Sequence, residues 1–477
     1  MNTYIKMEIK ARELGGRLLL ALAAAERGHS VLLGDVLPLM KRSNLVPPGI
    51  FHDTSLYPDH GQVARRAAML ANGFRITSQD EEHGLLEPTF DNYAVKRYSA
   101  RTLAQADAVM AWGPHDGDAL REHYPNFAER IQDVGSPRFD LYRPEFAPYF
   151  RARSRPGIGP DQRYVLFASN FTRVIGVNPF HVFVRNMRKA YFEGEDDPFE
   201  VLQYEEASAQ LDYLPHTVRA IRLLACANPD AVVVVRPHPQ ERPDAWQDLL
   251  GPIPNVLISR HGDIGRWIRG ASAVVHSGDT SGFEATLAEV PVISFVPLGG
   301  DHHWSDRFTN RLGWRADSAD QLVELASAAL HGQLGVDGTR DADAKLLTER
   351  VAHSDARFAA DAIVDLWEEL RRGLPDGATL SASDFERATR RRRAQVATRR
   401  RLRPIARVIR RVAGQVRGSG PGSEQLPFLT AQKFPPIRRS ELAEIVEGYR
   451  STLDRFHDVN IKQLSPWLIL LGKGRRG

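Results

Sequence analysis

An arginine and a histidine follow a run of valines where a predicted strand ends. The run Ala231–Val235 reads AVVVV and stops at Arg236-Pro237-His238-Pro239. A guanidinium group binds phosphate oxygens through two parallel hydrogen bonds, and a protonated imidazole beside it offsets the charge of a departing phosphate. The two prolines restrict the backbone and hold both side chains in an extended turn. The pattern predicts that Arg236 and His238 bind a phosphate group; the alternative is a surface turn whose arginine pairs with a carboxylate.

Small and polar residues also join a second apolar run to a predicted helix. The run 271–275 is followed by His276-Ser277-Gly278-Asp279-Thr280-Ser281-Gly282, and a helix begins at Phe283-Glu284-Ala285. Small residues let a ligand approach the backbone closely, and the free N–H groups at a helix start attract an anion. We therefore expect phosphate-binding groups from four residues of this stretch, namely His276, Ser277, Thr280 and Ser281.

Glu284, in the first turn of that helix, has two interpretations. Its carboxylate can bind the hydroxyl groups of a ribose, or it can complete a capping box with Ser281 and only satisfy the helix end. Asp279 would suit a metal ion, but no second carboxylate lies near it in the sequence. We therefore predict no metal site.

Two further polar stretches follow predicted strands. Asp80-Glu81-Glu82 ends a strand in the N-terminal half, where adjacent carboxylates can supply a general base or a nucleophile. The alternative is a solvated acidic turn. Ser169, Asn170 and Arg173 follow the first strand of the C-terminal half. We expect these three to bind the phosphate or the leaving group, although a plain turn fits the same residues.

Alternating strands and helices must position these groups. In residues 1–150 a strand pattern and a helix pattern alternate about five times, and a second series begins at Tyr164–Ala168. Such alternation is typical of parallel, doubly wound α/β sheets, whose ligands bind beyond the carboxyl ends of the strands. We therefore predict two Rossmann-like domains at 1–150 and 151–375, then a basic segment at 376–420 and a helical tail at 421–477, with its helix at Arg439–Phe456.

Charge is distributed unevenly along the 477 residues. The whole chain carries +4, but Glu386–Gly418 holds thirteen arginines and one glutamate, so the remainder carries −8. The segment Arg387–Arg417 lacks the interleaved aromatic side chains that stack on bases, which argues against nucleic acid. Its apolar positions suit a helix on an anionic membrane surface, with a solvated linker as the alternative. A single cysteine excludes an internal disulfide and favours a reducing compartment.

Together these features resemble bacterial surface-carbohydrate biosynthesis proteins of the capsule and O-antigen type. In the N-terminal half the likeness lies in Ala11-Arg12-Glu13-Leu14, Arg27-Gly28-His29-Ser30-Val31, Pro47-Pro48-Gly49-Ile50 and Asp80–Glu82. The C-terminal half is similar to the nucleotide-binding domain of two-Rossmann (GT-B) glycosyltransferases related to Kdo, sialic-acid and glycerophosphate transferases. That part of the likeness lies in the His-Pro element and the Ser/Thr-rich helix start. The resemblance covers roughly residues 4–370.

The resemblance implies a metal-independent glycosyltransferase that moves a sugar from a nucleotide donor to a growing surface polysaccharide or its lipid-linked acceptor. The implied donor is CMP-linked, such as a 3-deoxy-ulosonic acid, and no separate cofactor is needed. One acid among Asp80, Glu81 and Glu82 would deprotonate the acceptor hydroxyl or attack the anomeric carbon, and His238 would assist departure of the phosphate. The protein is expected in the cytoplasm, held at the inner face of the bacterial cell membrane by its basic segment.

Three other functions fit the same residues. One is a CDP-glycerol-type glycerophosphotransferase, and a second is a sugar-nucleotide epimerase of the same fold. The third is a non-catalytic polysaccharide-assembly protein. The first two act on a nucleotide-activated donor, so the predicted phosphate site serves both; the third needs no catalytic acid.

Overall fold

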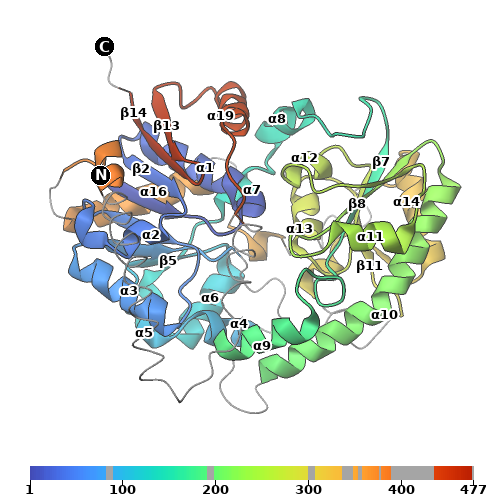
Figure 1. The fold of residues 1–477 in the computed structure, drawn as a ribbon, viewed down its shortest axis with the longest axis horizontal. Helices are drawn as coiled ribbons and strands as arrows, with labels where there is room; N and C mark the ends of the chain where they lie inside the picture. The colour runs from blue at the N-terminus through green and yellow to red at the C-terminus, as the bar shows by residue number, and fades with distance from the viewer. Residues whose placement is uncertain are drawn as a thin grey trace, which may run out of the picture.

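Two lobes, each built on one sheet, lie side by side in the protein (Figure 1). The structure is a computed structural model, and it describes residues 1–81, 90–190, 198–298, 307–335, 347–352, 357–374, 378–387 and 434–474. The first sheet has eight strands and the second has six. The predicted arrangement of two Rossmann-like lobes is therefore confirmed by the sheets of this chain.

The first lobe alternates strands with helices through the N-terminal part of the chain. Its elements there are β1 (Asn2–Lys6), α1 (Lys10–Glu26), β2 (Ser30–Gly34), α2 (Leu37–Met40), β3 (Ile50–Asp53), α3 (His60–Ala71), β4 (Arg75–Ser78), α4 (Phe90–Arg97), α5 (Ala100–Leu103), β5 (Ala108–Ala111), α6 (Pro114–His123), β6 (Ile131–Asp133), α7 (Pro137–Asp140) and α8 (Ala147–Ala152). The strands lie in the order β2-β1-β3-β4-β5-β6, and each pair of neighbours is parallel. The order reverses direction between β1 and β3, and ligand sites form at such a switch point.

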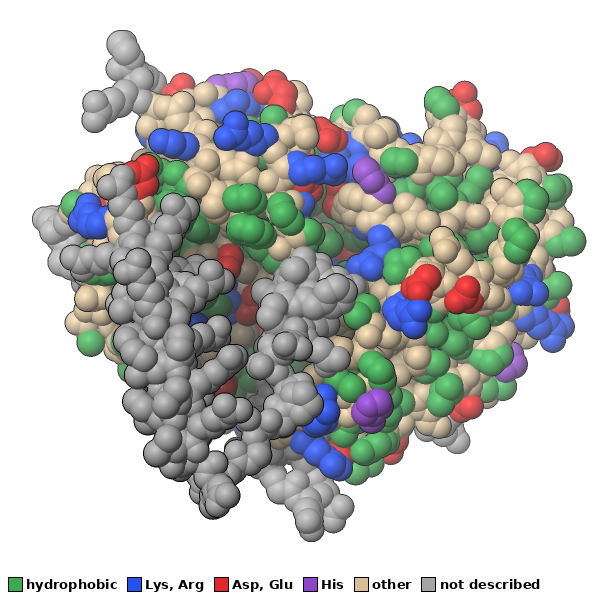
Figure 2. Space-filling view, in the orientation of Figure 1, with side chains coloured by type: hydrophobic (Ala, Val, Ile, Leu, Met, Phe, Trp, Pro, Cys, Tyr) green, Lys and Arg blue, Asp and Glu red, His purple; other side chains and the backbone are tan. Residues whose placement is uncertain are grey.

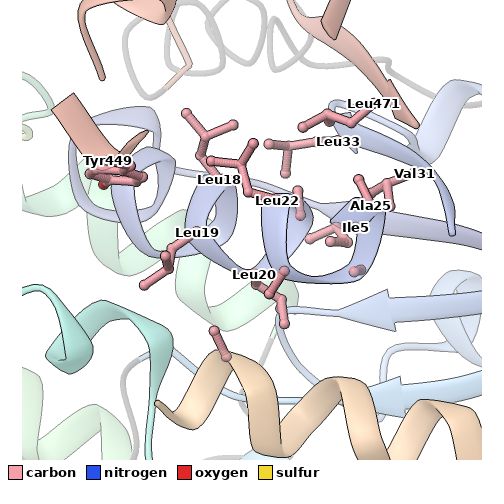
Figure 3. Packing of buried hydrophobic residues seen from close by; sticks show 14 of the residues in the cluster. Ile5, Leu18, Leu19, Leu20, Leu22, Ala25, Val31, Leu33, Tyr449 and Leu471 are labelled. Carbon is pink, nitrogen blue, oxygen red and sulfur yellow. The ribbon is translucent and has the colours of Figure 1, made fainter. Parts of the chain in front are cut away.

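Helix α1 forms the centre of the first lobe. Every residue from Leu18 to Ala25 is at most 1% exposed, because this stretch is apolar on all sides of the helix. In Figure 3, Leu18 and Leu22 point toward Leu33 and Leu471 of the sheet, and Leu19 and Leu20 point to the opposite side. A helix that buries every face in this way needs packing partners around it, and the chain supplies them from distant segments.

The second lobe follows the same alternation with longer helices. Its elements are β7 (Tyr164–Ala168), α9 (Phe180–Ala190), α10 (Pro198–Ala227), β8 (Val232–Arg236), α11 (Pro243–Leu250), β9 (Val256–Ile258), α12 (Gly265–Ile268), β10 (Ala273–His276), α13 (Thr280–Leu287), β11 (Val292–Phe295), β12 (Trp314–Ala316) and α14 (Ala319–Leu330). The six strands are parallel in the order β12-β11-β10-β7-β8-β9. Because parallel sheets are covered on both faces, the valine run of β8 is fully buried.

The end of the chain returns to the first lobe, which corrects the expected domain limits. Helix α16 (Ala359–Leu370) was expected in the second domain, but it packs on α1. The predicted tail helix is confirmed as α19 (Arg439–Leu453), and it is followed by β13 (Val459–Ser465) and β14 (Leu468–Lys473). Strand β14 pairs antiparallel with β2 and extends the first sheet, so the tail forms no separate helical unit. The apolar strand β14 thereby covers the edge of β2, which would otherwise be open.

Asp140 anchors the returning helix and predicts a pH dependence of stability. Its carboxylate accepts hydrogen bonds from the backbone N–H groups of Ala359 and Ala360, each at 2.9 Å. Burial raises the pKa of Asp140 from 3.8 to about 7. Between these values the folded protein binds a proton that the unfolded chain has released, so this group lowers stability as the pH rises.

We therefore expect Asp140→Asn to flatten the fall in melting temperature between about pH 4 and pH 7. Asp118→Asn is the matched control, because Asp118 is exposed on α6. Equal slopes of melting temperature against pH in wild type and Asp140→Asn would contradict the assignment.

Candidate active site

A cleft of about 880 Å³ lies between the two lobes. The first lobe lines it with the segments that follow β1, β3 and β4, with α7 and with α19. The second lobe lines it with the segments that follow β7, β8 and β9 and with the start of α13. Figure 2 shows the molecule hollowed between the lobes, with basic and acidic side chains near the hollow. The carboxyl ends of strands from both sheets meet here, so the cleft is the candidate active site.

The start of α13 faces the cleft, as the sequence predicts. Thr280 and Ser281 line the cleft, and Thr280 Oγ1 accepts a hydrogen bond from Arg138 at 3.2 Å. The N-cap is Asp279, whose carboxylate accepts hydrogen bonds from the Ser281 backbone N–H at 2.8 Å and from the Ser281 hydroxyl. Ser281 therefore does not begin a capping box. Burial raises the pKa of Asp279 to about 6, so mild acid removes the negative charge of this cap.

His276 and Ser277 do not reach the cleft, and their predicted role in phosphate binding is wrong. His276 is 1% exposed; its Nδ1 accepts from the Gly278 N–H at 3.1 Å, and its Nε2 lies 3.1 Å from the Ser294 hydroxyl. Burial lowers the pKa of His276 to about 3, which keeps the ring neutral. A Cβ at Gly282 would lie 2.2 Å from this ring, so the glycine lets α13 pack over it. The Ser277 hydroxyl donates to the carbonyl of Phe295 in the neighbouring strand.

The Arg236-Pro237-His238-Pro239 turn lies in the cleft, and a buried glutamate accepts a hydrogen bond from its backbone. Arg236 and His238 both line the cleft, and His238 is half-buried. The Glu241 carboxylate accepts from the His238 backbone N–H at 3.2 Å, from the Ser169 hydroxyl at 2.6 Å and from Trp246 Nε1 at 3.0 Å. Sequence reasoning missed Glu241. It joins the ends of β7 and β8, and its position two residues after the proline-rich turn is the sequence signal that could have revealed it.

The residues after β7 differ in how available they are to a ligand. Asn170 lines the cleft and is half-buried. Ser169 also lines it, but its hydroxyl is directed to Glu241. Arg173 lines the cleft with its guanidinium held by Gln203 at 2.8 Å and Glu206 at 3.1 Å, both on α10. Of the three predicted ligand-binding residues, Asn170 is the one whose side chain forms no hydrogen bond within the described part of the chain.

The acidic triplet after β4 divides into a structural residue and a cleft residue. Asp80 is 0% exposed, does not line the cleft, and binds Arg97 through both carboxylate oxygens at 2.5 and 2.6 Å. Its predicted catalytic role is therefore wrong. Glu81 lines the cleft and pairs with Arg17 at 2.8 Å, and its Oε2 has no hydrogen-bond partner among the described residues. Glu82 lies outside the described residues.

Arg138, a residue that sequence reasoning missed, joins the two lobes inside the cleft. Its guanidinium binds Glu284 at 2.6 Å as well as Thr280, and both partners belong to α13 of the second lobe. The Arg138 and Glu284 side chains are 7% and 2% exposed. A Cβ at Gly16 would lie 2.6 Å from the Arg138 backbone nitrogen, so the glycine of α1 lets α7 approach. The glycine pair in α1 was the available signal for this contact.

The remaining expectations concern parts of the chain that the structure leaves largely undescribed. The basic segment Arg387–Arg417 lies, apart from Arg387, outside the described residues, so its membrane contact stays a prediction. Within the described ranges, no helix combines the length and the apolar character of a bilayer-spanning segment. In the same ranges, no three His, Cys, Asp or Glu side chains gather as they would around a metal ion.

Comparison with known proteins gives structural likeness only. No protein-family model and no curated protein matches the chain. Among solved structures, a putative UDP-N-acetylglucosamine 2-epimerase from Listeria monocytogenes is 12% identical, with a TM-score of 0.47 over 80% of this chain and 99% of that one. The UDP-GlcNAc 2-epimerase of Methanocaldococcus jannaschii is 12% identical, with a TM-score of 0.44 over 77% and 100%. The wall teichoic acid polymerase TagF is 11% identical, with a TM-score of 0.40 over 71% and 92%. The fold assignment rests on the chain's own sheet topology.

Proposed function

We propose that this chain is a glycosyltransferase that uses a nucleotide-sugar donor. The observation that carries the proposal is the cleft itself. Its lining includes Glu81 from the first lobe and Thr280, Ser281 and His238 from the second lobe, at the carboxyl ends of two doubly wound sheets. A carboxylate on one side and phosphate-binding groups on the other are what a transfer from an activated donor requires.

The second lobe supplies the groups for the donor. The hydroxyl of Thr280 can donate to a phosphate oxygen, and Arg138 beside it adds a guanidinium donor. The hydroxyl of Ser281 lines the cleft next to it but donates to Asp279. His238 lies in the same cleft after β8, two strands from β10, where a protonated imidazole would offset the charge that develops on the leaving phosphate. Glu284 pairs with Arg138, so it would orient that guanidinium as well as reach a ribose. We propose a CMP-linked 3-deoxy-ulosonic acid as the donor, because the sequence resembles surface-carbohydrate transferases that use such donors.

The first lobe supplies the group for the acceptor. Glu81 would remove the proton from the acceptor hydroxyl as that oxygen attacks the anomeric carbon and the bond to the donor phosphate breaks. Arg17 holds one of its carboxylate oxygens, and the other, which is buried, has no hydrogen-bond partner among the described residues. The surface polysaccharide acceptor is likewise proposed on the resemblance.

Nucleotide binding tests the proposal first. We expect one of CMP, CDP, UDP or GDP to raise the melting temperature; saturation at a hundred times its dissociation constant adds about 2.7 kcal/mol of stability. The double variant Thr280→Ala/Ser281→Ala should lose most of this shift, whereas Ser327→Ala on the outer helix α14 should keep it. Absence of a shift with every nucleotide would contradict the proposal.

Product analysis separates the alternatives. A transferase needs an acceptor for turnover, a glycerophosphotransferase consumes CDP-glycerol, and an epimerase releases an altered or free sugar without any acceptor. His238→Ala should lose turnover while the fold persists; retained assembly function without turnover would favour the non-catalytic role.

A further inference from the structure

Three arginines from separate elements line the cleft without a carboxylate partner. Arg236 ends β8, Arg260 lies in the segment after β9, and Arg438 directly precedes α19. None of them forms an ion pair with a carboxylate among the described residues, whereas the arginine at 138 pairs with Glu284. Uncompensated positive charge on three converging elements is the feature that the donor site leaves unexplained.

Backbone carbonyls hold two of these guanidinium groups in place. Arg236 donates to the carbonyls of His261 at 3.1 Å and Gly262 at 2.5 Å. Arg260 donates to the carbonyl of Pro239 at 2.8 Å. Carbonyl dipoles orient a guanidinium but do not cancel its charge. Burial lowers the pKa of Arg236 only to about 10, so it stays charged at neutral pH. The charge of Asp263 attracts Arg236, but other arginines share that carboxylate, so an anionic ligand would relieve the remaining cost of burying this cation.

The sheet order separates these arginines from the start of α13. Strand β7 lies between β8 and β10, so the ends of β8 and β10 are two strand spacings apart, about 10 Å. The Arg236 side chain points away from β10, because its two acceptors follow β9 on the far side of β8. The two groups therefore do not converge on one phosphate, which corrects the expectation that Arg236 and Ser281 hold the same leaving group.

His261 lies near Arg236 and Arg438, whose charges act on its ring together with that of the neighbouring Arg266. Its pKa is lowered first by burial and then by the charges of Arg266, Arg438 and Arg236, with Glu441 acting in the opposite direction. The nearby carboxylate of Asp263 is already shared between Arg266 at 3.2 Å and Arg153 at 3.4 Å. Glu441 is likewise bound by Lys10 of the first lobe at 2.6 Å. The acidic groups around His261 thus pair with other cations.

We propose that Arg236, Arg260 and Arg438 form a second anion subsite, which binds a phosphate group carried by the acceptor. The assignment of this subsite to the acceptor rests on the proposed function, whereas the inference that it binds an anion rests on geometry alone. Arg438 and the Lys10–Glu441 pair connect the subsite to the first lobe, which holds Glu81. The donor phosphate has its own donors at the start of α13, so an anion at the second subsite belongs to the other substrate.

The test follows the pKa of His261 in the full-length protein by NMR of carbon-13-labelled histidine rings, assigned with His261→Gln. Glycerol 3-phosphate should raise the pKa of His261, because a bound anion offsets the neighbouring arginines. In Arg260→Gln/Arg438→Gln, glycerol 3-phosphate should bind about tenfold more weakly for each arginine removed, since each forms a charge-assisted hydrogen bond. The control Arg219→Gln/Arg315→Gln removes two exposed charges from the second lobe and should bind as wild type does.

The outcomes separate this subsite from the donor site. Ser281→Ala should leave the response of His261 unchanged; a response lost in Ser281→Ala but kept in Arg260→Gln/Arg438→Gln would overturn the proposal. No response in wild type would also overturn it, even if a nucleotide raises the melting temperature and the donor proposal stands. Dihexanoyl phosphatidate, used below its micelle concentration, distinguishes the source: tighter binding than glycerol 3-phosphate assigns a lipid-linked phosphate, and equal binding assigns a soluble one.

Discussion

Glu81→Gln is expected to lower turnover by about 10²–10⁴-fold, the usual contribution of a general base. Glu81 follows β4, lines the cleft, and keeps its Oε2 without a hydrogen-bond partner among the described residues. A glutamine preserves the shape of the side chain but cannot accept the proton of an acceptor hydroxyl. Nucleotide binding should survive, because the donor groups belong to the other lobe.

Two companion variants make this result interpretable. Glu81→Asp keeps the carboxylate and should restore part of the turnover that the glutamine variant loses. Asp80→Asn should lower the melting temperature instead, because Asp80 is buried and binds Arg97 with both oxygens. If Asp80→Asn lost turnover at unchanged stability while Glu81→Gln stayed active, the assignment of the two acids would be reversed.

Arg138→Met is expected to destabilise the protein by about 3–5 kcal/mol, the usual cost of removing one partner of a buried ion pair. Glu284 would keep a buried carboxylate with its main cation removed, and its pKa, already raised by burial, would rise further. Because Arg138 and Glu284 belong to different lobes, thermal unfolding should also lose cooperativity between them. Differential scanning calorimetry measures both effects.

The double variant Arg138→Met/Glu284→Met tests whether the pair is the cause. Removing both charges should restore much of the lost stability, because no unpaired charge remains buried. Arg315→Met is the matched control in the second lobe: Arg315 pairs with Asp317 at an exposed position, and such pairs contribute about 0–1 kcal/mol. Additive losses in the double variant would show that the two residues do not depend on each other.

Local sequence patterns predicted the parts of the site that depend on neighbouring residues. The valine run of β8 and the apolar run of β10 read as buried strands because parallel strands are covered on both faces. The turn at Arg236–Pro239 and the helix start at Thr280 follow those strands directly, so both reach the cleft. The same reasoning located the tail helix α19, whose periodicity is local.

Local patterns did not show which side chains of a motif are buried and which point into the cleft. Asp80 and Glu81 are adjacent, yet Arg97, seventeen positions along the chain, binds the first and leaves the second in the cleft. His276 lies beside the residues of the α13 start, yet its ring turns into the core toward Ser294. Which neighbour faces a ligand depends on side chains that the fold brings in from elsewhere.

The sequence by itself determined two α/β lobes with phosphate-binding chemistry at strand ends, because apolar runs, glycines and prolines act over a few residues. The tertiary structure alone shows that α16, β13 and β14 complete the first lobe and that Arg138 bridges to Glu284. It also brings Arg438 into the cleft that Arg236 and Arg260 line. These contacts join residues more than a hundred positions apart. The packing of α16 and β14 follows because the apolar stretch of α1 and the open edge of β2 must be covered, and no local pattern states which distant segment will do so.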